Sequence, residues 1–175
     1  EAAGVEDGTL VIFTADQGLA CGQNGLWAMG DHTRPLSAFD PMIHVPLIYR
    51  HPGAVAPGRR SPRVVSNYDF LPTVLDYLGL ADGAPQQPPI PGRSYGATLT
   101  GAAQAWDDTV FFEYENTRAV RTDRWKYIER FPSGPSELYD LQDDPEERRN
   151  RVDEPPLAAQ QATLRDQLDS FFNRY

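Results

Sequence analysis

The chain has 175 residues, about one domain's worth and long enough to bury a hydrophobic core. Its 25 acidic residues outnumber the 16 basic ones, and the net charge of -9 argues against a surface that binds the phosphate backbone of nucleic acid. Cys21 is the only cysteine, which excludes an internal disulfide, and no apolar run is long enough to span a membrane. We therefore expect a soluble protein without nucleic-acid or membrane partners, and the choice between cytoplasm and periplasm stays open.

The first strong pattern is an apolar, β-branched run over residues 9–13, which predicts a strand. The strand leads directly into Asp16, Gln17 and Gly18, and ligands of open α/β sheets bind beyond the carboxyl ends of strands. A carboxylate and an amide carbonyl offer the oxygen ligands that calcium and magnesium prefer, and a glycine permits a sharp turn. Taken alone, the pattern favours a polar turn at the strand end over a metal site.

A glycine-rich segment follows over residues 19–30. It contains Cys21, for which a small, partly buried loop position is a commoner outcome than a nucleophile. Beyond it, Arg34 carries a permanent, forked positive charge that suits an anion. His32 is a titratable group, although an ordinary surface histidine is the more frequent outcome. A short apolar run over 45–49 carries a proline, so we expect a strand at a sheet edge or one that begins just after the proline.

The middle of the chain alternates one helix with one irregular segment. Residues 66–80 predict an amphipathic helix, with a polar cap among the first four residues and Gly79 at its end. Residues 81–101 are rich in proline and glycine, which is typical of a domain linker, a polyproline ligand or a structured loop. We favour the structured loop.

The last third predicts a small antiparallel sheet with a helix. Aromatic and β-branched runs indicate strands at 109–115, 119–121 and 125–129. Asp144 followed by Pro145 predicts the start of a helix, because these residues favour the N-cap and first helical positions. The final segment, 156–175, has an apolar stripe suited to cover one face of the sheet.

Several blocks of the sequence, taken in order, resemble the sulfatase family of the alkaline-phosphatase-like superfamily. The blocks read TADQG at 14–18, GQNGLW at 22–27, VPLI at 45–48, RAVRTDRWKYI at 118–128 and ELYDLQDDPEE at 137–147. The resemblance implies an α/β fold in two parts. Residues 1–100 would form part of an alkaline-phosphatase-like α/β/α sandwich, and residues 101–175 a small α+β subdomain with an antiparallel sheet and a terminal helix.

The resemblance also implies a chemistry. In this family a formylglycine, made from the first residue of a Cys/Ser-x-Pro-x-Arg motif, attacks the sulfur of a sulfate ester that a calcium ion holds. It follows that Asp16 and Gln17 are ligands of the metal, either calcium or magnesium, and that Asn24, His32 and Arg34 face the sulfate or its leaving group. Asn24 stands where the family commonly has a histidine, and an amide is no general acid near neutral pH.

No Cys/Ser-x-Pro-x-Arg motif occurs in the 175 residues. We therefore expect the formylglycine, the other metal ligands and the N-terminal part of the same fold upstream. The chain would then be the C-terminal portion of a sulfatase-like hydrolase, inactive by itself, whose intact form hydrolyses a sugar, aryl or alkyl sulfate ester. One alternative is a phosphonate or phosphodiester hydrolase of the same superfamily. Another is a non-catalytic pseudo-sulfatase or interaction module, motivated by Asn24 and by Met29 near the place of a family lysine.

Overall fold

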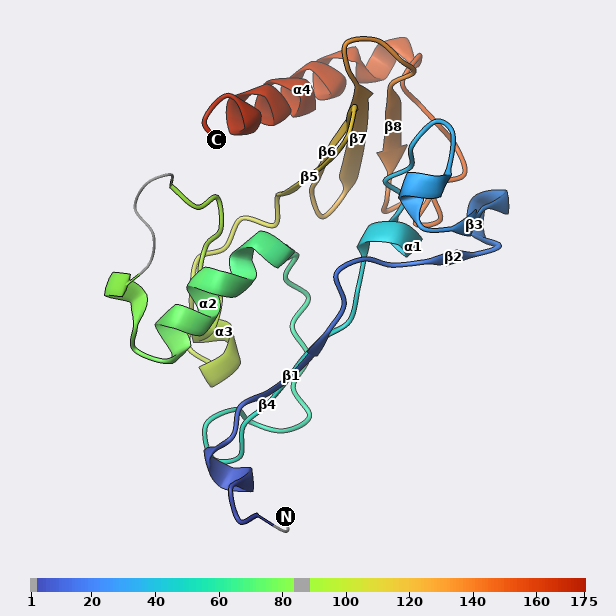
Figure 1. Ribbon diagram of the computed structural model, residues 1–175. Helices are drawn as coiled ribbons and strands as arrows, with labels where there is room; N and C mark the ends of the chain where they lie inside the picture. Colours follow the sequence, from blue (N-terminus) through green and yellow to red (C-terminus); the bar gives the residue numbers. More distant parts are fainter. Residues whose placement is uncertain (1–2, 84–88) are drawn as a thin grey trace. The chain divides into compact units, whose positions relative to one another are not determined.

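A computed structural model describes residues 3–83 and 89–175 of the chain (Figure 1). Residues 84–88 belong to the predicted loop 81–101 and lie outside the described residues. No helix in the described part of the chain is both long and apolar enough to cross a membrane.

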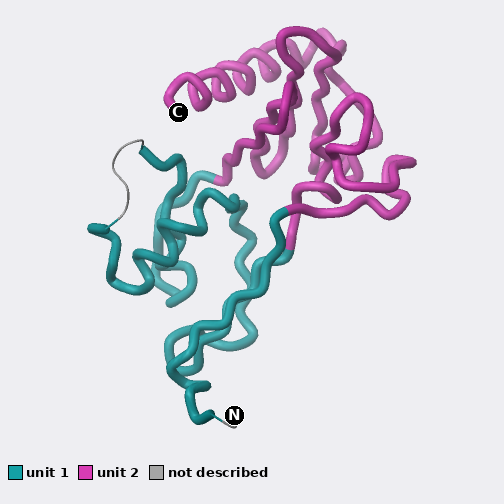
Figure 2. The backbone as a smooth tube through the Cα atoms, in the orientation of Figure 1, with its two compact units in different colours: residues 1–16, 46–107 teal, residues 17–45, 108–175 magenta. Residues whose placement is uncertain are grey.

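Contacts group the chain into two units, each built from two segments of sequence (Figure 2). Unit 1 combines residues 1–16 with 46–107, and unit 2 combines residues 17–45 with 108–175. The two predicted parts, which divide the chain between residues 100 and 101, follow the order of the sequence instead and stay a prediction.

Unit 1 contains the two strands expected near the start of the chain. β1 (Val11–Thr14) pairs antiparallel with β4 (Leu47–Arg50), and β4 begins just after Pro46, as predicted. Phe13 lies opposite Ile48, and directly paired residues of an antiparallel ladder point to the same face. That face is exposed, since Phe13 and Ile48 keep 60% and 57% of their accessible surface. The ribbon therefore presents an apolar side to solvent.

The helices of unit 1 confirm the pattern predicted over 66–80. A short 3-10 turn leads into α2 (Phe70–Tyr77), and α3 (Gly96–Thr100) follows. Asp69 is fully buried, and its carboxylate accepts hydrogen bonds from the backbone N–H of Ser66 at 2.9 Å and of Arg93 at 2.8 Å. Asp69 thus caps the helix and ties the segment around Arg93 to it, so this part of the predicted loop is structured.

Unit 2 is built on a four-stranded antiparallel sheet in which neighbours in sequence are neighbours in space. Its strands are β5 (Val110–Tyr114), β6 (Thr117–Arg121), β7 (Trp125–Arg130) and β8 (Glu137–Asp140). The terminal helix α4 (Ala158–Phe172) covers one face, as predicted (Figure 1). Leu164 and Leu168 of this helix pack in one cluster with Tyr127 of β7. Alternation along β7 sends Ile128 to the opposite face, where it packs with Ala38.

The segment 17–45 therefore covers the second face of this sheet. It contains a hairpin of β2 (Ala20–Cys21) and β3 (Trp27–Ala28) and ends in a single helical turn, α1 (Asp40–Ile43). A hydrogen bond of 2.8 Å from the Gly18 N–H to the Met42 carbonyl joins the beginning of the segment to its end. A Cβ at Gly18 would lie 2.2 Å from the Pro41 carbonyl oxygen, so this approach requires a glycine.

The predicted helix start at Asp144 is wrong. Residues 141–147 form turns instead, with hydrogen bonds from the Asp144 N–H to the Asp140 carbonyl and from the Glu147 N–H to the Asp144 carbonyl. Glu147 adopts a left-handed backbone conformation with φ of 54°, which a right-handed helix does not accept. We call residues 144–147 the acidic turn.

We expect Gly92→Ala to destabilise the chain by about 2 kcal/mol, because the new methyl group collides with backbone that cannot yield. A Cβ at Gly92 would lie 1.9 Å from the carbonyl oxygen of Tyr68, next to the buried cap of α2. Gly8→Ala is the matched control, since a Cβ there meets nothing within 4 Å. Urea unfolding followed by circular dichroism checks both variants, and equal midpoints for the two would contradict this account of the packing.

Candidate functional site

Asp16 and Gln17 follow β1 directly, as the sequence predicts. The carbonyl of Asp16 accepts a hydrogen bond from the Asn67 side chain at 3.1 Å, and the Gln17 amide donates to the sulfur of Met29. The two side chains offer at most three oxygens, which suit a hard cation but fall short of the six to eight that calcium takes. Within the described residues, no group of three or more His, Cys, Asp and Glu side chains is placed to hold a metal ion.

Asn24 is held by the acidic turn. Its backbone is left-handed with φ of 54°, a conformation that asparagine tolerates well. Its side-chain nitrogen donates to the carbonyl oxygens of Glu146 at 3.1 Å and Glu147 at 3.2 Å. Because both partners are acceptors, they fix the orientation of the amide and use its donors. A direct contact between Asn24 and a sulfate stays a prediction.

His32 and Arg34 lie on one exposed stretch of the segment 17–45. The His32 ring contacts the Asp31 carboxylate at 2.7 Å. One nitrogen of the Arg34 guanidinium donates to the carbonyls of Asp31 at 2.9 Å and Thr33 at 2.7 Å, which orients the rest of the fork. Both residues are accessible to a ligand, and their predicted contacts with sulfate stay predictions.

Two pockets lie along this segment, both within unit 2. A smaller one of about 320 Å³ brings Arg34 and Asn24 together, along with Arg130 of β7. A larger one of about 750 Å³ runs between the start of the segment, α1 and the acidic turn, and its polar lining includes Asn24, His44 and Arg148. Asn24 therefore stands between the two pockets, whereas His32 lines neither of them.

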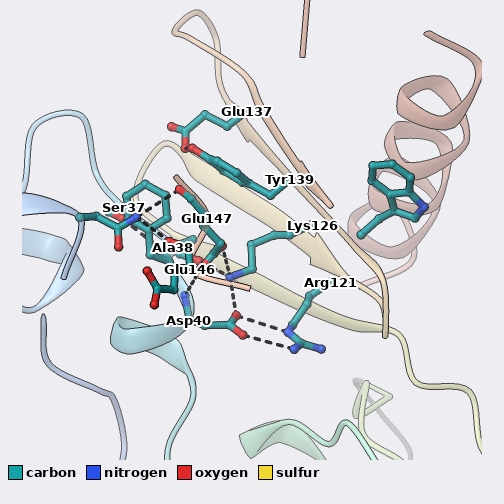
Figure 3. A network of polar contacts seen from close by, with 12 residues as sticks. Ser37, Ala38, Asp40, Arg121, Lys126, Glu137, Tyr139, Glu146 and Glu147 are labelled. Atoms are coloured by element: carbon teal, nitrogen blue, oxygen red, sulfur yellow. Dashed lines mark hydrogen bonds and ion pairs between the residues drawn. The ribbon is translucent and has the colours of Figure 1, made fainter. Parts of the chain in front are cut away.

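A buried ionic network beneath α1 escaped the sequence reasoning (Figure 3). The ammonium of Lys126 lies 2.5 Å from Asp40 and 2.6 Å from Glu147, and it donates to the Ala38 carbonyl at 3.0 Å. The second oxygen of Glu147 accepts the Asp40 N–H at 2.6 Å. The signal was available in β7, where alternation puts Lys126 on the same inward face as Ile128.

Burial and charge act in opposite directions on the two carboxyls of the network. Burial raises the pKa of Glu147, and the Lys126 ammonium only partly offsets this. Burial also acts to raise the pKa of Asp40, but Lys126 and Arg121 outweigh it, so the pKa of Asp40 lies below its ordinary value of 3.8. The guanidinium of Arg121 reaches both oxygens of Asp40, at 3.2 and 3.3 Å.

We expect Asp40→Asn to lower the free energy of unfolding at pH 7 by about 3 kcal/mol. We also expect the free energy of unfolding of this variant to fall less steeply than that of wild type as the pH is lowered. The pKa of Asp40 is lower in the folded chain, so its stabilisation is complete above the unfolded value of 3.8 and is lost as the pH falls through the folded value. Urea unfolding between about pH 5 and pH 1 measures this loss.

Asp166→Asn, at an exposed position of α4, is the control for that experiment. A variant at Asp40 with the same acid limb as wild type would show that the carboxylate does not support the fold as an ion.

Comparison with known proteins identifies the chain's relatives. The family described as N-sulphoglucosamine sulphohydrolase, C-terminal, matches residues 35–174. A Delta 4,5-hexuronate-2-O-sulfatase of Bacteroides thetaiotaomicron is 30% identical over 179 residues, which cover 95% of this chain and 35% of that protein. The chain thus spans about a third of the length of the curated relatives it matches.

Solved structures agree with the sequence match. One solved structure is that of a protein in complex with its substrate, D-glucosamine-2-N,6-O-disulfate. It superposes on this chain with a TM-score of 0.84 at 26% identity, over 99% of this chain and 36% of that one. The phosphonate monoester hydrolase of Agrobacterium radiobacter gives a TM-score of 0.82 at 27% identity, over 99% and 37% of the two chains. The α/β fold class predicted from the sequence is therefore confirmed, and the chain belongs to the sulfatase family, within its N-sulphoglucosamine sulphohydrolase C-terminal domain family.

Proposed function

We propose that the chain is the C-terminal portion of a metal-dependent hydrolase of sulfate esters and supplies part of its metal and anion site. The family match over residues 35–174 carries the proposal. The position of Asp16 and Gln17, two and three residues beyond the end of β1, supports it, because ligands of open α/β sheets bind beyond strand ends. The sulfatase family generally depends on a metal ion and a formylglycine, and calcium is our choice of metal, with magnesium as the alternative.

In this proposal each residue has one task. Asp16 and Gln17 bind the cation, which supplies charge neutralisation and orientation of the sulfate when bound. Arg34 binds the anion through the part of its guanidinium that its backbone contacts leave accessible. His32 is the candidate proton donor for the leaving group, and Asn24 contacts the sulfate only if it gives up its bonds to the acidic turn.

The nucleophile has to come from the part of the fold that this chain does not span, since its 175 residues lack the Cys/Ser-x-Pro-x-Arg motif. The exposed apolar face of the β1–β4 ribbon, with Phe13 and Ile48, supports such a partner. A two-stranded ribbon is marginally stable alone, and an apolar face of this kind gains stability when covered. We propose that the N-terminal part of the same fold packs on this face, with residues 1–100 completing the catalytic body and 101–175 forming its C-terminal subdomain.

Hydrolysis of a phosphonate monoester is the second candidate function. The structural likeness to a phosphonate monoester hydrolase favours it, because its TM-score of 0.82 is close to the 0.84 of the complex with D-glucosamine-2-N,6-O-disulfate. A non-catalytic role is the third, motivated by Asn24 and by Met29, which lies near the place of a family lysine and contacts the amide of Gln17.

Calcium titration of the chain by calorimetry tests the metal site. Two ligands give weak binding, so we expect a dissociation constant on the order of 1 mM, lost in Asp16→Ala and kept in the exposed control Asp166→Ala. No turnover of a chromogenic aryl sulfate is expected from the chain alone. Tight binding that survives Asp16→Ala would place the metal ligands elsewhere.

A chimera tests the anion site and the reaction class. This chain would replace the matched third of the Bacteroides Delta 4,5-hexuronate-2-O-sulfatase, and turnover of an aryl sulfate and of a phenyl phosphonate would be compared. Arg34→Lys keeps the charge but loses the fork, so we expect KM to rise about 10-fold with kcat nearly unchanged. Arg165→Lys in α4 is the control, and an unchanged KM for Arg34→Lys would remove Arg34 from the anion site.

A further inference from the structure

We infer that Lys126, Asp40 and Glu147 act as positioning residues, which together form an ionic clamp that sets the geometry of the segment 17–45. The segment carries Gln17, Asn24 and Arg34 of the candidate site. The consequence for catalysis rests on the proposed function, whereas the clamp itself is a property of unit 2. Figure 3 shows its members converging from β7, α1 and the acidic turn.

The contacts of the Lys126 ammonium among the described residues come from the segment and from the acidic turn. Its side chain is 0% exposed, and an ammonium has three protons to place. Its nitrogen contacts Ala38 and Asp40 at the end of the segment, and Glu147 in the acidic turn. A buried ammonium without such partners would be strongly unfavourable, so the position of Lys126 dictates where the other groups lie.

The acidic turn holds the segment at two distant points. Through its carboxylate, Glu147 accepts the N–H of Asp40 near the end of the segment. Through its carbonyl, together with that of Glu146, it accepts the side chain of Asn24 near the beginning. A left-handed glutamate is uncommon and is kept only where its surroundings fix it, which fits a residue that serves both contacts.

The inward face of β7 supports the same stretch of backbone at every second residue. Lys126 donates to the Ala38 carbonyl, Ile128 packs against the Ala38 side chain, and Arg130 donates to the Leu36 carbonyl at 2.5 Å. Arg121 of β6 donates two hydrogen bonds to the carboxylate of Asp40. Strand alternation thus places one charged, one apolar and one charged side chain along residues 36–40, which fixes the register of the segment on the sheet.

Hydrogen exchange on the 175-residue chain tests the clamp. Its reporters are the N–H groups of Gly18, Gly22 and Ser37, which bond within the segment. We expect Lys126→Met and Glu147→Gln to speed their exchange at least 10-fold, with less than 3-fold change for the amides shared by β6 and β7. Asp140→Asn is the matched control, because it removes a buried charge of the same sheet whose ion partners are Arg124 and Arg151, while the asparagine oxygen can still accept the backbone N–H groups of Gln142 and Asp143.

A double-variant cycle separates a clamp from a general loss of stability. With Lys126 already replaced by Met, Glu147→Gln should change segment exchange by a smaller factor than it does in wild type, because the charge pair is already gone. If Lys126→Met does not fold, two milder variants replace it. Glu147→Gln keeps the size of the side chain, and Asn24→Ala lies at the protein surface. Hydrogen exchange in the segment is compared with exchange in the sheet for both variants.

Equal acceleration in the segment and in the sheet, or unchanged exchange in the segment, would overturn the clamp. Neither result depends on a metal or on turnover. Absence of sulfate hydrolysis by the chimera would therefore contradict the proposed function and leave the clamp standing. Hydrolysis by the chimera together with unchanged exchange in the segment would support the proposed function and overturn the clamp.

Discussion

The burial of one ammonium group governs the architecture around the candidate site. Lys126 sits on a strand whose neighbours form a core, and a charge in that place requires carboxylates and a carbonyl to meet it. Those groups come from residues 38–40 and from Glu147, which are far apart in sequence. The chain satisfies the ammonium by folding an early segment onto a late sheet. That buried contact positions the segment 17–45, which carries Gln17, Asn24 and Arg34 of the candidate site.

Local patterns predicted the regular elements of the fold well. Alternation and β-branched residues located β5, β6 and β7 of the small sheet but not β8, and the apolar stripe of 156–175 predicted the helix that covers the sheet. The second cover was not foreseen, because 36–40 has no periodicity that separates it from an ordinary loop. The helix predicted at Asp144 failed for a related reason. Asp-Pro is a good local start signal, yet the tertiary contacts of Glu147 impose a left-handed turn three residues later.

The candidate site also has a part that local sequence patterns predicted and a part that they did not. The strand-end position of Asp16 and Gln17 follows from an apolar run and a polar tip, which are neighbours in sequence. Asn24 stood out in the sequence only because the resemblance to sulfatases leads us to expect a histidine there. Its two acceptors lie more than 120 residues away, and nothing local to Asn24 indicates them. Predicting the ionic network would have required knowing which loop packs on which face of the sheet. Alternation in the sequence indicates the two faces of a strand, but it does not indicate which segment packs on each face.

The contacts of Asn24 give an asparagine at this position a physical reason. Its left-handed backbone suits asparagine, and its partners are two carbonyl oxygens that need two hydrogens from one nitrogen. A neutral imidazole carries a single N–H and would leave one carbonyl unpaired. The residue that best holds the acidic turn is therefore an amide, which does not titrate near neutral pH. The Asn24 side-chain nitrogen that binds the two carbonyls cannot also act as a proton donor in catalysis. Under the proposed function, a leaving-group oxygen that needs a proton would have to receive it from a group other than Asn24.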